Sequence, residues 1–242
     1  VMITGLGGSG IGGTIVSELT AQECTVPVCT NKGYDLPGYI NENTLVICSS
    51  FSGNTEETLE AFEKAKAKNA EIACISSGGK LIELAKAQNL NYIQLAPGDS
   101  PRAMMGYSIT QLLYVLNHYG LISDGFKNEL TKTASLIDEL QEEIQADAEK
   151  ITNHLFGKIP IIYACDGYKG MAVRFTQQLA ENSKMLSWHN IIPEMNHNEL
   201  VGWRTKNENL AVIFFRNETD HKRNQKRIEI NNEVVSKYTS SV

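Results

Sequence analysis

The sequence has no long apolar run and no excess of basic charge. None of its hydrophobic stretches approaches the roughly 18 to 20 residues that a membrane-spanning helix needs. Its 22 lysines and arginines are outnumbered by 28 aspartates and glutamates, which leaves a formal net charge of −6. A chain of this charge offers little of the basic surface that binds nucleic acid. We therefore expect neither a membrane partner nor a nucleic-acid partner.

The sequence also lacks CxxC pairs and any set of His, Cys, Asp and Glu residues at metal-ligand spacing. The five cysteines are Cys24, Cys29, Cys48, Cys74 and Cys165. Most of them lie in apolar stretches, as is typical of small buried hydrophobic residues in a reducing compartment. Val1 begins a strand-like stretch without the basic start and cleavage pattern of a signal peptide. We expect a cytoplasmic protein that uses no metal and no cofactor.

What is present is the composition of a globular protein, with 42% hydrophobic and 21% charged residues. The first half alternates short apolar runs with amphipathic helical stretches. The expected strands are 1–4, 25–29, 44–49, 71–75 and 91–95. The expected helices are 14–20, 54–69, 80–88 and 103–119. Strands that are apolar throughout and alternate with helices indicate an α/β protein with a parallel sheet covered on both faces.

The second half begins with a highly charged segment in which Leu136, Leu140 and Ile144 recur at helical spacing. We predict one long connecting helix here, after which the strand–helix pattern restarts. The expected strands are 160–165 and 210–215, and the expected helices are 171–182 and 221–238. This pattern divides the chain into an N-terminal lobe (1–122), a connecting helix (123–155) and a second lobe (156–242).

The second lobe has only about two convincing strands, which would leave its sheet with a poorly covered edge. We therefore expect this lobe to be incomplete, either because the protein continues beyond Val242 or because a partner completes it. The missing initiator Met likewise predicts that an upstream segment is absent.

A glycine-rich segment, GLGGSGIGG at 5–13, follows the first expected strand and precedes a helix. Without side chains, such a loop can turn sharply and offer several N–H groups to an anion at a helix N-terminus. Gly5, Gly7 and Gly10 also fit the dinucleotide pattern GxGxxG, which is weak evidence by itself. The second expected strand ends near Asn31 without the acidic residue that would bind a ribose. We therefore favour an anion other than a dinucleotide.

A second segment suited to anions, SSFSGNT at 49–55, follows another expected strand. It places the hydroxyls of Ser50, Ser52 and Thr55 where a helix starts, which makes a compact phosphate cradle without a lysine or a metal. Helix capping by Thr55 and Thr58 is an alternative, and for Ser52 or Thr55 alone the two interpretations have equal weight. The clustering of hydroxyl and glycine positions favours the phosphate site.

The pattern S-x-S-G-x-T after a strand, preceded by G-x-G-G-S-G, resembles the SIS (sugar isomerase) domain. Further segments are similar to those of the bifunctional phosphoglucose/phosphomannose isomerases: Ser100-Pro101-Arg102, ENSK at 181–184 and PEMNHNE at 193–199. The resemblance covers nearly the whole chain. It implies two SIS-type lobes with flavodoxin-like parallel sheets, and a phosphorylated hexose as substrate.

The resemblance also implies the residues of the site. Ser50, Ser52 and Thr55 match the positions that bind the sugar's phosphate, and Gly8 and Ser9 match the loop that faces the sugar. The family further implies a homodimer with a shared active site at the subunit interface.

For catalysis the resemblance implies Glu181 as the base that moves a proton between C2 and C1, His197 as the ring opener, and Arg102 as the group that stabilises the cis-enediolate. These types suit the chemistry, because histidine exchanges protons near neutral pH and arginine keeps its charge. Taken singly, Glu181 could be a surface carboxylate and His197 a residue beside a helix cap. Glu194 and Glu199 are interpreted as structural rather than catalytic.

Three functions follow from these observations. The leading one is the interconversion of glucose 6-phosphate, and also mannose 6-phosphate, with fructose 6-phosphate. A phosphosugar-sensing SIS module would need the serine/threonine loop but neither Glu181 nor His197. A nicotinamide-dependent enzyme would need an acidic residue at the end of the second strand, which is absent.

Overall fold

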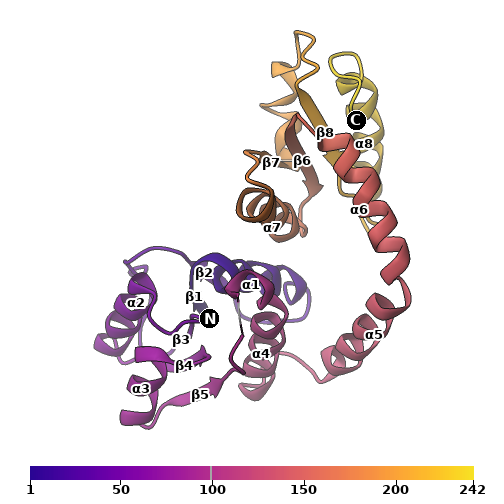
Figure 1. Cartoon of the computed structure of the whole chain (residues 1–242). Helices are drawn as coiled ribbons and strands as arrows, with labels where there is room; N and C mark the ends of the chain where they lie inside the picture. Colours follow the sequence, from indigo (N-terminus) through magenta and orange to yellow (C-terminus); the bar gives the residue numbers. More distant parts are fainter. Residues whose placement is uncertain (99) are drawn as a thin grey trace. The chain divides into compact units, whose positions relative to one another are not determined.

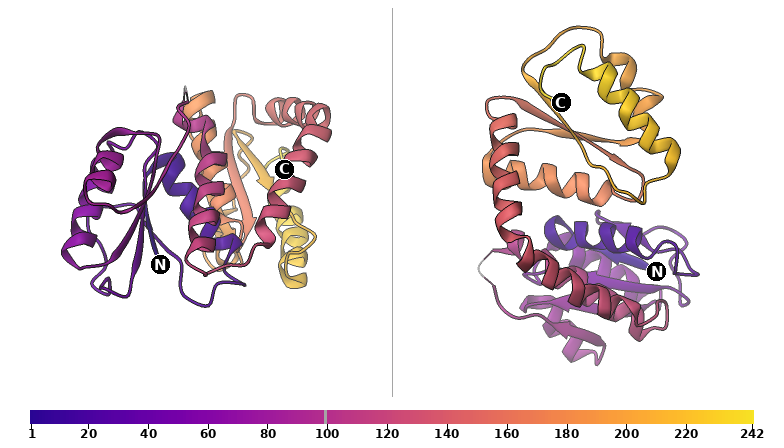
Figure 2. Two further views of the ribbon diagram at one scale, coloured as in Figure 1. Left: turned by 90° about the horizontal axis from the view of Figure 1, so that it is seen from below. Right: turned by 90° about the vertical axis from the view of Figure 1, so that its right-hand side faces the viewer.

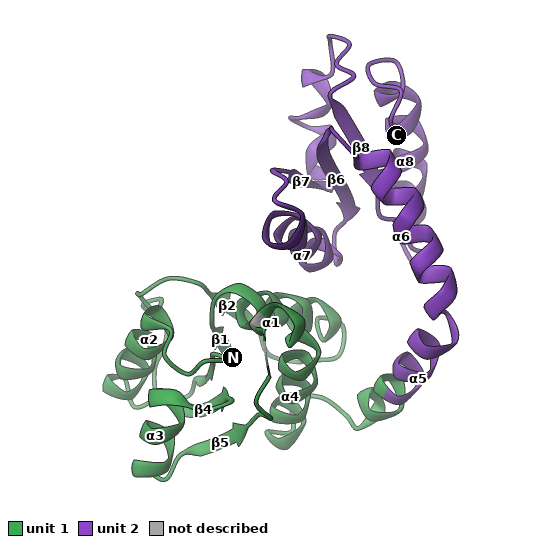
Figure 3. Ribbon diagram, in the orientation of Figure 1, with its two compact units in different colours: residues 1–130 green, residues 131–242 purple. Residues whose placement is uncertain are grey.

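A computed structural model describes residues 1–98 and 100–242. The chain divides into two compact units, residues 1–130 and residues 131–242 (Figure 3). Both are α/β units with parallel strands. Among the described residues, no helix has the length and apolar character to cross a membrane.

Unit 1 is a five-stranded parallel sheet with the strand order β2-β1-β3-β4-β5. Its strands are β1 (Met2–Thr4), β2 (Cys29–Asn31), β3 (Leu45–Ser49), β4 (Glu71–Ser76) and β5 (Asn91–Gln94). Its helices are α1 (Gly7–Leu19), α2 (Glu56–Ala67), α3 (Gly79–Ala87) and α4 (Met105–His118). This strand order is the flavodoxin-like one, as predicted.

Helices cover both faces of the unit 1 sheet (Figures 1 and 2). Ile3 and Ile47 pack in one apolar cluster with residues of α1 and α4. Met2, Val46 and Cys48 pack in a second cluster with residues of α2 and α3. Successive residues of a strand thus point to opposite faces, and both faces are buried. This is why the strands are apolar throughout.

Unit 2 contains a three-stranded parallel sheet with the order β7-β6-β8. Its strands are β6 (Ile159–Cys165), β7 (Trp188–Ile192) and β8 (Leu210–Phe214), and its principal helices are α6 (Gln141–Leu155), α7 (Lys169–Gln178) and α8 (Lys222–Val235). Residues of α7 pack with one face of the sheet. Residues of α8 pack with the other face, together with Met195 and Trp203 from the β7–β8 connection. Figure 2 shows the sheet between α7 and α8.

The prediction of two strands in the second lobe was wrong, because β7 was missed. This strand lies at one edge of the sheet, and only Ile192 of its five residues is buried. Its sequence, WHNII, therefore carries the polar residues that an edge strand tolerates. The short apolar run that marks a central strand is missing.

The connecting segment predicted at 123–155 is helical, in two pieces. The helices α5 (Gly125–Glu139) and α6 meet at Leu140. Backbone hydrogen bonds run through the junction, from Leu140 N to Leu136 O (3.0 Å) and from Ile144 N to Leu140 O (2.8 Å). The boundary between the two units falls inside α5, and the predicted lobe limits at 122 and 156 stay a prediction.

Two predicted boundaries in unit 1 were wrong. The glycine-rich segment predicted as a loop is helical from Gly7 onward, not from residue 14. Its glycines allow α1 to lie directly on the sheet, since a Cβ at Gly13 would come within 2.8 Å of Ile3 Cγ2. The strand predicted at 25–29 forms at Cys29–Asn31 instead. Pro27 has no N–H to donate to a strand ladder.

Candidate functional site

The two predicted anion loops lie side by side in unit 1. The glycine-rich segment follows β1 and the serine/threonine loop follows β3, and these two strands pair directly. The strand order reverses between β1 and β3, so this is the topological switch point of the sheet. In open parallel sheets, ligands bind outside the carboxyl ends of the strands at this point.

The hydroxyls of the serine/threonine loop form a small hydrogen-bonded cluster. Ser50 Oγ lies 2.8 Å from Thr55 Oγ1 and accepts the N–H of Gly53 at 3.1 Å. Ser52 Oγ accepts the N–H of Asn54 at 3.2 Å. Thr55 is the N-cap residue of α2, but its side chain caps no helix N–H. Capping therefore does not explain the Thr55 hydroxyl, which faces Ser50 instead.

Ser9 joins the glycine-rich helix to this loop. Its hydroxyl, in the first turn of α1, accepts the N–H of Phe51 at 3.2 Å. Gly5 makes a further close approach, because a Cβ there would lie 2.5 Å from Ser49 O. Ser9 is buried and the adjacent Gly8 is half-buried. Unit 1 therefore brings together all five residues predicted to bind the substrate: Gly8, Ser9, Ser50, Ser52 and Thr55.

A third segment that the sequence analysis missed, SSGG at 76–79, completes this cluster. The carbonyl oxygen of Phe51 accepts hydrogen bonds from Ser76 Oγ (3.2 Å), Ser77 Oγ (2.6 Å) and Ser77 N (3.0 Å). Because the peptide group is planar and trans, the N–H of Ser52 points away from this carbonyl oxygen. The signal was the run of serine and glycine after an expected strand.

Arg102 lies on the short turn Pro101–Ala103, between β5 and α4. The turn packs against α1, the helix that carries Gly8 and Ser9. The Arg102 side chain is exposed. The helix α4, which follows this turn, approaches the carboxyl end of β3, where Ser108 Oγ lies 3.4 Å from Ser49 Oγ.

Glu181 lies in a π-helical turn, Leu179–Ser183, that continues α7. Such turns are often found at functional sites because they widen the helix and redirect side chains. The turn ends at Lys184, which has a left-handed backbone (φ 57°) and donates from Nζ to the Glu181 carbonyl oxygen at 2.6 Å. The predicted helix 171–182 therefore ends irregularly at the predicted base.

A buried cation lies near Glu181. Burial lowers the pKa of Arg174, and the negative charge of Glu181 partly restores it. Arg174 is 5% exposed, whereas Glu181 is half-buried. The two residues are seven positions apart, which is about two helical turns and places them on the same side of the helix.

His197 follows a short 3-10 turn, Glu194–Asn196, after β7. Its imidazole is exposed, and its backbone N–H donates to Glu194 O at 2.9 Å. The segment that carries His197 packs with the α8 face of the sheet, whereas α7 and the turn of Glu181 pack with the opposite face. The two predicted proton-transfer residues thus come from segments on different faces of one sheet.

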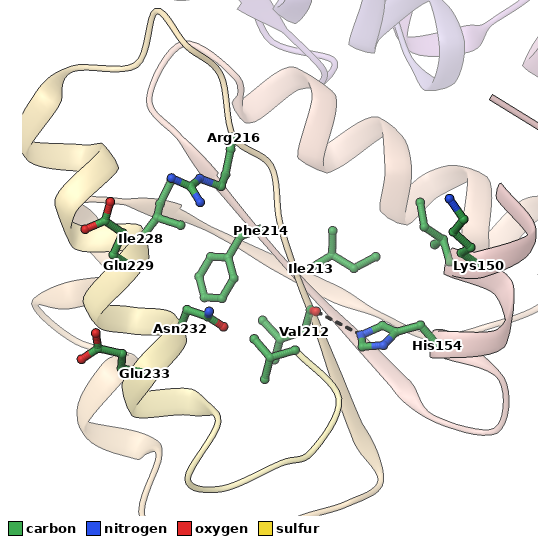
Figure 4. Close-up of a pocket in the computed structure, with 12 residues that line it drawn as sticks. Lys150, His154, Val212, Ile213, Phe214, Arg216, Ile228, Glu229, Asn232 and Glu233 are labelled. Atoms are coloured by element: carbon green, nitrogen blue, oxygen red, sulfur yellow. Dashed lines mark hydrogen bonds between the residues drawn. The ribbon is translucent and has the colours of Figure 1, made fainter. Parts of the chain in front are cut away.

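A groove of about 710 Å³ lies beside β8, between α6 and α8 (Figure 4). Its lining includes Lys150 on α6 and Glu233 on α8, and Arg216 lies beside Glu229 on the α8 side (Figure 4). His154 lies there as well, with Nε2 3.3 Å from Val212 O. The groove contains none of the predicted site residues.

The chain is similar in sequence to several sugar-phosphate enzymes. Residues 144–242 match the family of the bacterial phospho-glucose isomerase C-terminal SIS domain. The whole chain is 38% identical to a bifunctional phosphoglucose/phosphomannose isomerase of Caldicellulosiruptor bescii, over 74% of that protein. A protein of the same name from Aquifex aeolicus is 34% identical, over 98% of this chain and 73% of its own length. A D-glucosamine-6-phosphate 4-epimerase of Sulfolobus acidocaldarius is 32% identical, over 86% of this chain and 65% of its own length.

Solved structures share the fold. Glucosamine-6-phosphate deaminase from Thermotoga maritima superimposes with a TM-score of 0.76 over 96% of this chain and 72% of its own, at 13% identity. The C-terminal domain of glucosamine-fructose-6-phosphate aminotransferase from Francisella tularensis gives 0.75 over 98% and 69%, at 19% identity.

Proposed function

Because the chain belongs to the bifunctional phosphoglucose/phosphomannose isomerase family, we propose that it interconverts glucose 6-phosphate and mannose 6-phosphate with fructose 6-phosphate. One observation of the structure carries this proposal. The glycine-rich start of α1 and the serine/threonine loop meet at the switch point of a parallel sheet, joined by the hydrogen bond from Phe51 N to Ser9 Oγ.

The phosphate group binds at the serine/threonine loop. Hydroxyls of Ser50, Ser52 and Thr55 donate to its oxygens, together with backbone N–H groups at the start of α2. The positive end of the helix dipole favours the negative charge, so the cradle requires neither a lysine nor a metal. Gly8 and Ser9 form the wall that faces the sugar.

The reaction moves protons and needs no redox cofactor. His197 opens the sugar ring by moving a proton between the ring oxygen and the anomeric hydroxyl. Glu181 then removes the proton from C2 of the open aldose and returns it to C1, while the hydroxyl proton on O2 passes to O1, so that C1 becomes a hydroxymethyl group and C2 a carbonyl. Arg102 stabilises the negative charge of the cis-enediolate between these steps.

We propose a cytoplasmic homodimer with shared active sites, in which His197 serves the site of the partner subunit. The support is the placement of Glu181 and His197 in segments on opposite faces of the unit 2 sheet.

The test is a coupled assay with glucose 6-phosphate and mannose 6-phosphate. Glu181→Gln removes the base and keeps the side-chain shape, so we expect turnover to fall at least about 100-fold while binding of the phosphosugar is retained. The matched control is Glu149→Gln, on the exposed surface of α6. A variant Glu181→Gln that turns over at the wild-type rate would sink the assignment.

The same assay separates the other functions. Wild-type protein that binds both phosphosugars without converting them would favour a sensing module. Conversion of glucosamine 6-phosphate alone would favour the chemistry of the Sulfolobus acidocaldarius relative, which is named an epimerase of that sugar phosphate.

A further inference from the structure

The Glu199 carboxylate is the centre of a hydrogen-bond network in unit 2. Its Oε1 accepts from Tyr163 Oη at 2.6 Å and from Trp188 Nε1 at 3.1 Å. Its Oε2 accepts from Asn190 Nδ2 at 2.6 Å. The donors come from β6 and β7, whereas Glu199 belongs to the connection after β7. Charge-assisted hydrogen bonds of this kind are stronger than neutral ones.

This network fixes the segment that carries His197. Glu199 is two residues after His197, and Asn196 directly before it donates from Nδ2 to Asn231 Oδ1 on α8 at 2.6 Å. Trp203 adds a hydrogen bond from Nε1 to Tyr163 Oη at 3.1 Å. The exposed His197 thus lies between two residues, Asn196 and Glu199, whose side chains are both held by hydrogen bonds.

The carboxylate has little capacity left for a substrate. It accepts three hydrogen bonds, and a carboxylate offers about four acceptor positions. The phenol of Tyr163 also remains a donor, because burial and then the hydrogen bond to Glu199 raise its pKa. Glu199 therefore has the surroundings of a group that positions others, not of one that exchanges protons.

We propose that Glu199 is a positioning residue that holds His197 in place for ring opening. This inference rests on the proposed role of His197. Proton transfer is sensitive to displacement of the reacting group, because the donor and acceptor atoms must lie within hydrogen-bond reach, about 2.6–3.2 Å. An imidazole on an exposed connection reaches that accuracy only if its backbone is held, and Glu199 is the charged group that does so.

The test is the variant Glu199→Gln. Glutamine has nearly the same volume as glutamate, but one of its two terminal groups is an NH2 donor. That group cannot accept a hydrogen bond from Tyr163, Trp188 or Asn190, so at least one of the three hydrogen bonds is lost. We expect kcat to fall about 10- to 100-fold with KM changed less than about threefold. The matched control is Glu194→Gln, in the same segment, whose carboxylate accepts from Asn198 Nδ2 at an exposed position (2.7 Å). This control should keep a near wild-type kcat.

A double-mutant cycle separates positioning from mere stability. If Glu199 acts through His197, Glu199→Gln should lower kcat by less than about twofold in a His197→Ala background. A purely structural effect would lower kcat equally in both backgrounds, and that result would overturn the inference. The inference would also be overturned if Glu199→Gln kept the wild-type kcat while His197→Ala had a reduced kcat. An unimpaired His197→Ala would instead contradict the proposed role of His197.

A milder variant covers the case in which Glu199→Gln does not fold. Trp188→Phe removes only the Nε1 donor, from a side chain that is 40% exposed. We expect it to lower kcat about three- to tenfold in the wild-type background and not in the His197→Ala background. An unchanged kcat in a folded Trp188→Phe variant would contradict the inference.

Discussion

At the scale of single residues, the hydroxyls of the proposed phosphate cradle hydrogen-bond within their own loop. Ser50 is 2% exposed, and its hydroxyl holds the N–H of Gly53 and faces Thr55. The backbone of Phe51 is fixed on both sides, by Ser9 at its N–H and by Ser77 at its carbonyl oxygen. The cradle is therefore preorganised, and a ligand has little ordering cost to overcome.

The variant Ser50→Ala tests this residue. Loss of the hydroxyl removes one phosphate donor and leaves the Gly53 N–H without its side-chain acceptor. We expect inorganic phosphate to bind at least about tenfold more weakly, with about 1 kcal/mol lost from the free energy of unfolding. Calorimetric titration with phosphate and urea unfolding measure the two effects. Ser17→Ala is the control, because that hydroxyl donates only to Thr14 O within α1 (2.8 Å). Equal phosphate affinities for wild type and Ser50→Ala would contradict the assignment.

At the scale of elements, the glycines of α1 decide how closely this helix packs on the sheet. A Cβ at Gly10 would overlap the carbonyl oxygen of Gly5, and one at Gly13 would press on Ile3. The helix therefore approaches the ends of β1 and β3 more closely than a helix with side chains could. The glycine-rich segment is therefore a packing surface, whatever its part in the proposed anion site.

Substitution of these glycines should destabilise unit 1. For Gly10→Ala we expect a loss of about 2–4 kcal/mol in the free energy of unfolding, because a backbone carbonyl cannot move aside. The control is Gly106→Ala in α4, where a Cβ meets no heavy atom within 4 Å. That variant should gain about 0.5–1 kcal/mol from its higher helix propensity. Urea unfolding followed by circular dichroism distinguishes the two, and equal midpoints would refute the packing argument.

At the scale of the whole molecule, the proposed shared active site predicts that two impaired variants restore each other. Glu181→Gln and His197→Ala subunits each lack one group, and a mixed dimer contains one site with both. After unfolding and refolding together, we expect up to about a quarter of wild-type activity, whereas each variant alone keeps only its low residual activity. Size-exclusion chromatography with light scattering gives the oligomeric state. No recovery from a mixed dimer would show that one subunit supplies both residues.

Stability of both units should fall at alkaline pH. Burial and the hydrogen bond to Glu71 raise the pKa of Tyr119 in unit 1 to about 12. Burial and the charges of Asp220 and Asp166 raise the pKa of Cys165 in unit 2 to about 12. The folded protein thus keeps protons that the unfolded chain releases near pH 9–10, so stability is full below that range and is lost as pH rises toward 12.

Urea midpoints at pH 8 and pH 11 measure the loss. Trp188 and Trp203 both belong to unit 2, so tryptophan fluorescence follows that unit alone. Equal midpoints at the two pH values would contradict the prediction.

The sequence by itself determined the parallel α/β class of both units, and it predicted the two segments of the proposed cradle. Strands buried on both faces must be apolar throughout, and segments such as Leu45–Ser49 show this without any tertiary information. Ser50, Ser52 and Thr55 were predicted as phosphate-binding residues from equally local features. Their hydroxyls follow a strand and precede a helix, so local sequence predicts an anion site there.

Only the tertiary structure decided the features that depend on contacts between distant segments. Within the residues that the structure describes, β7 pairs with a strand on one side only, and its polar sequence does not reveal the strand. The turn of Glu181 departs from the α-helix, and Glu199 draws Tyr163 from 36 residues away. The register of the sheet brings such partners together. A carboxylate that looks like a plain structural residue in the sequence therefore becomes the group that holds His197.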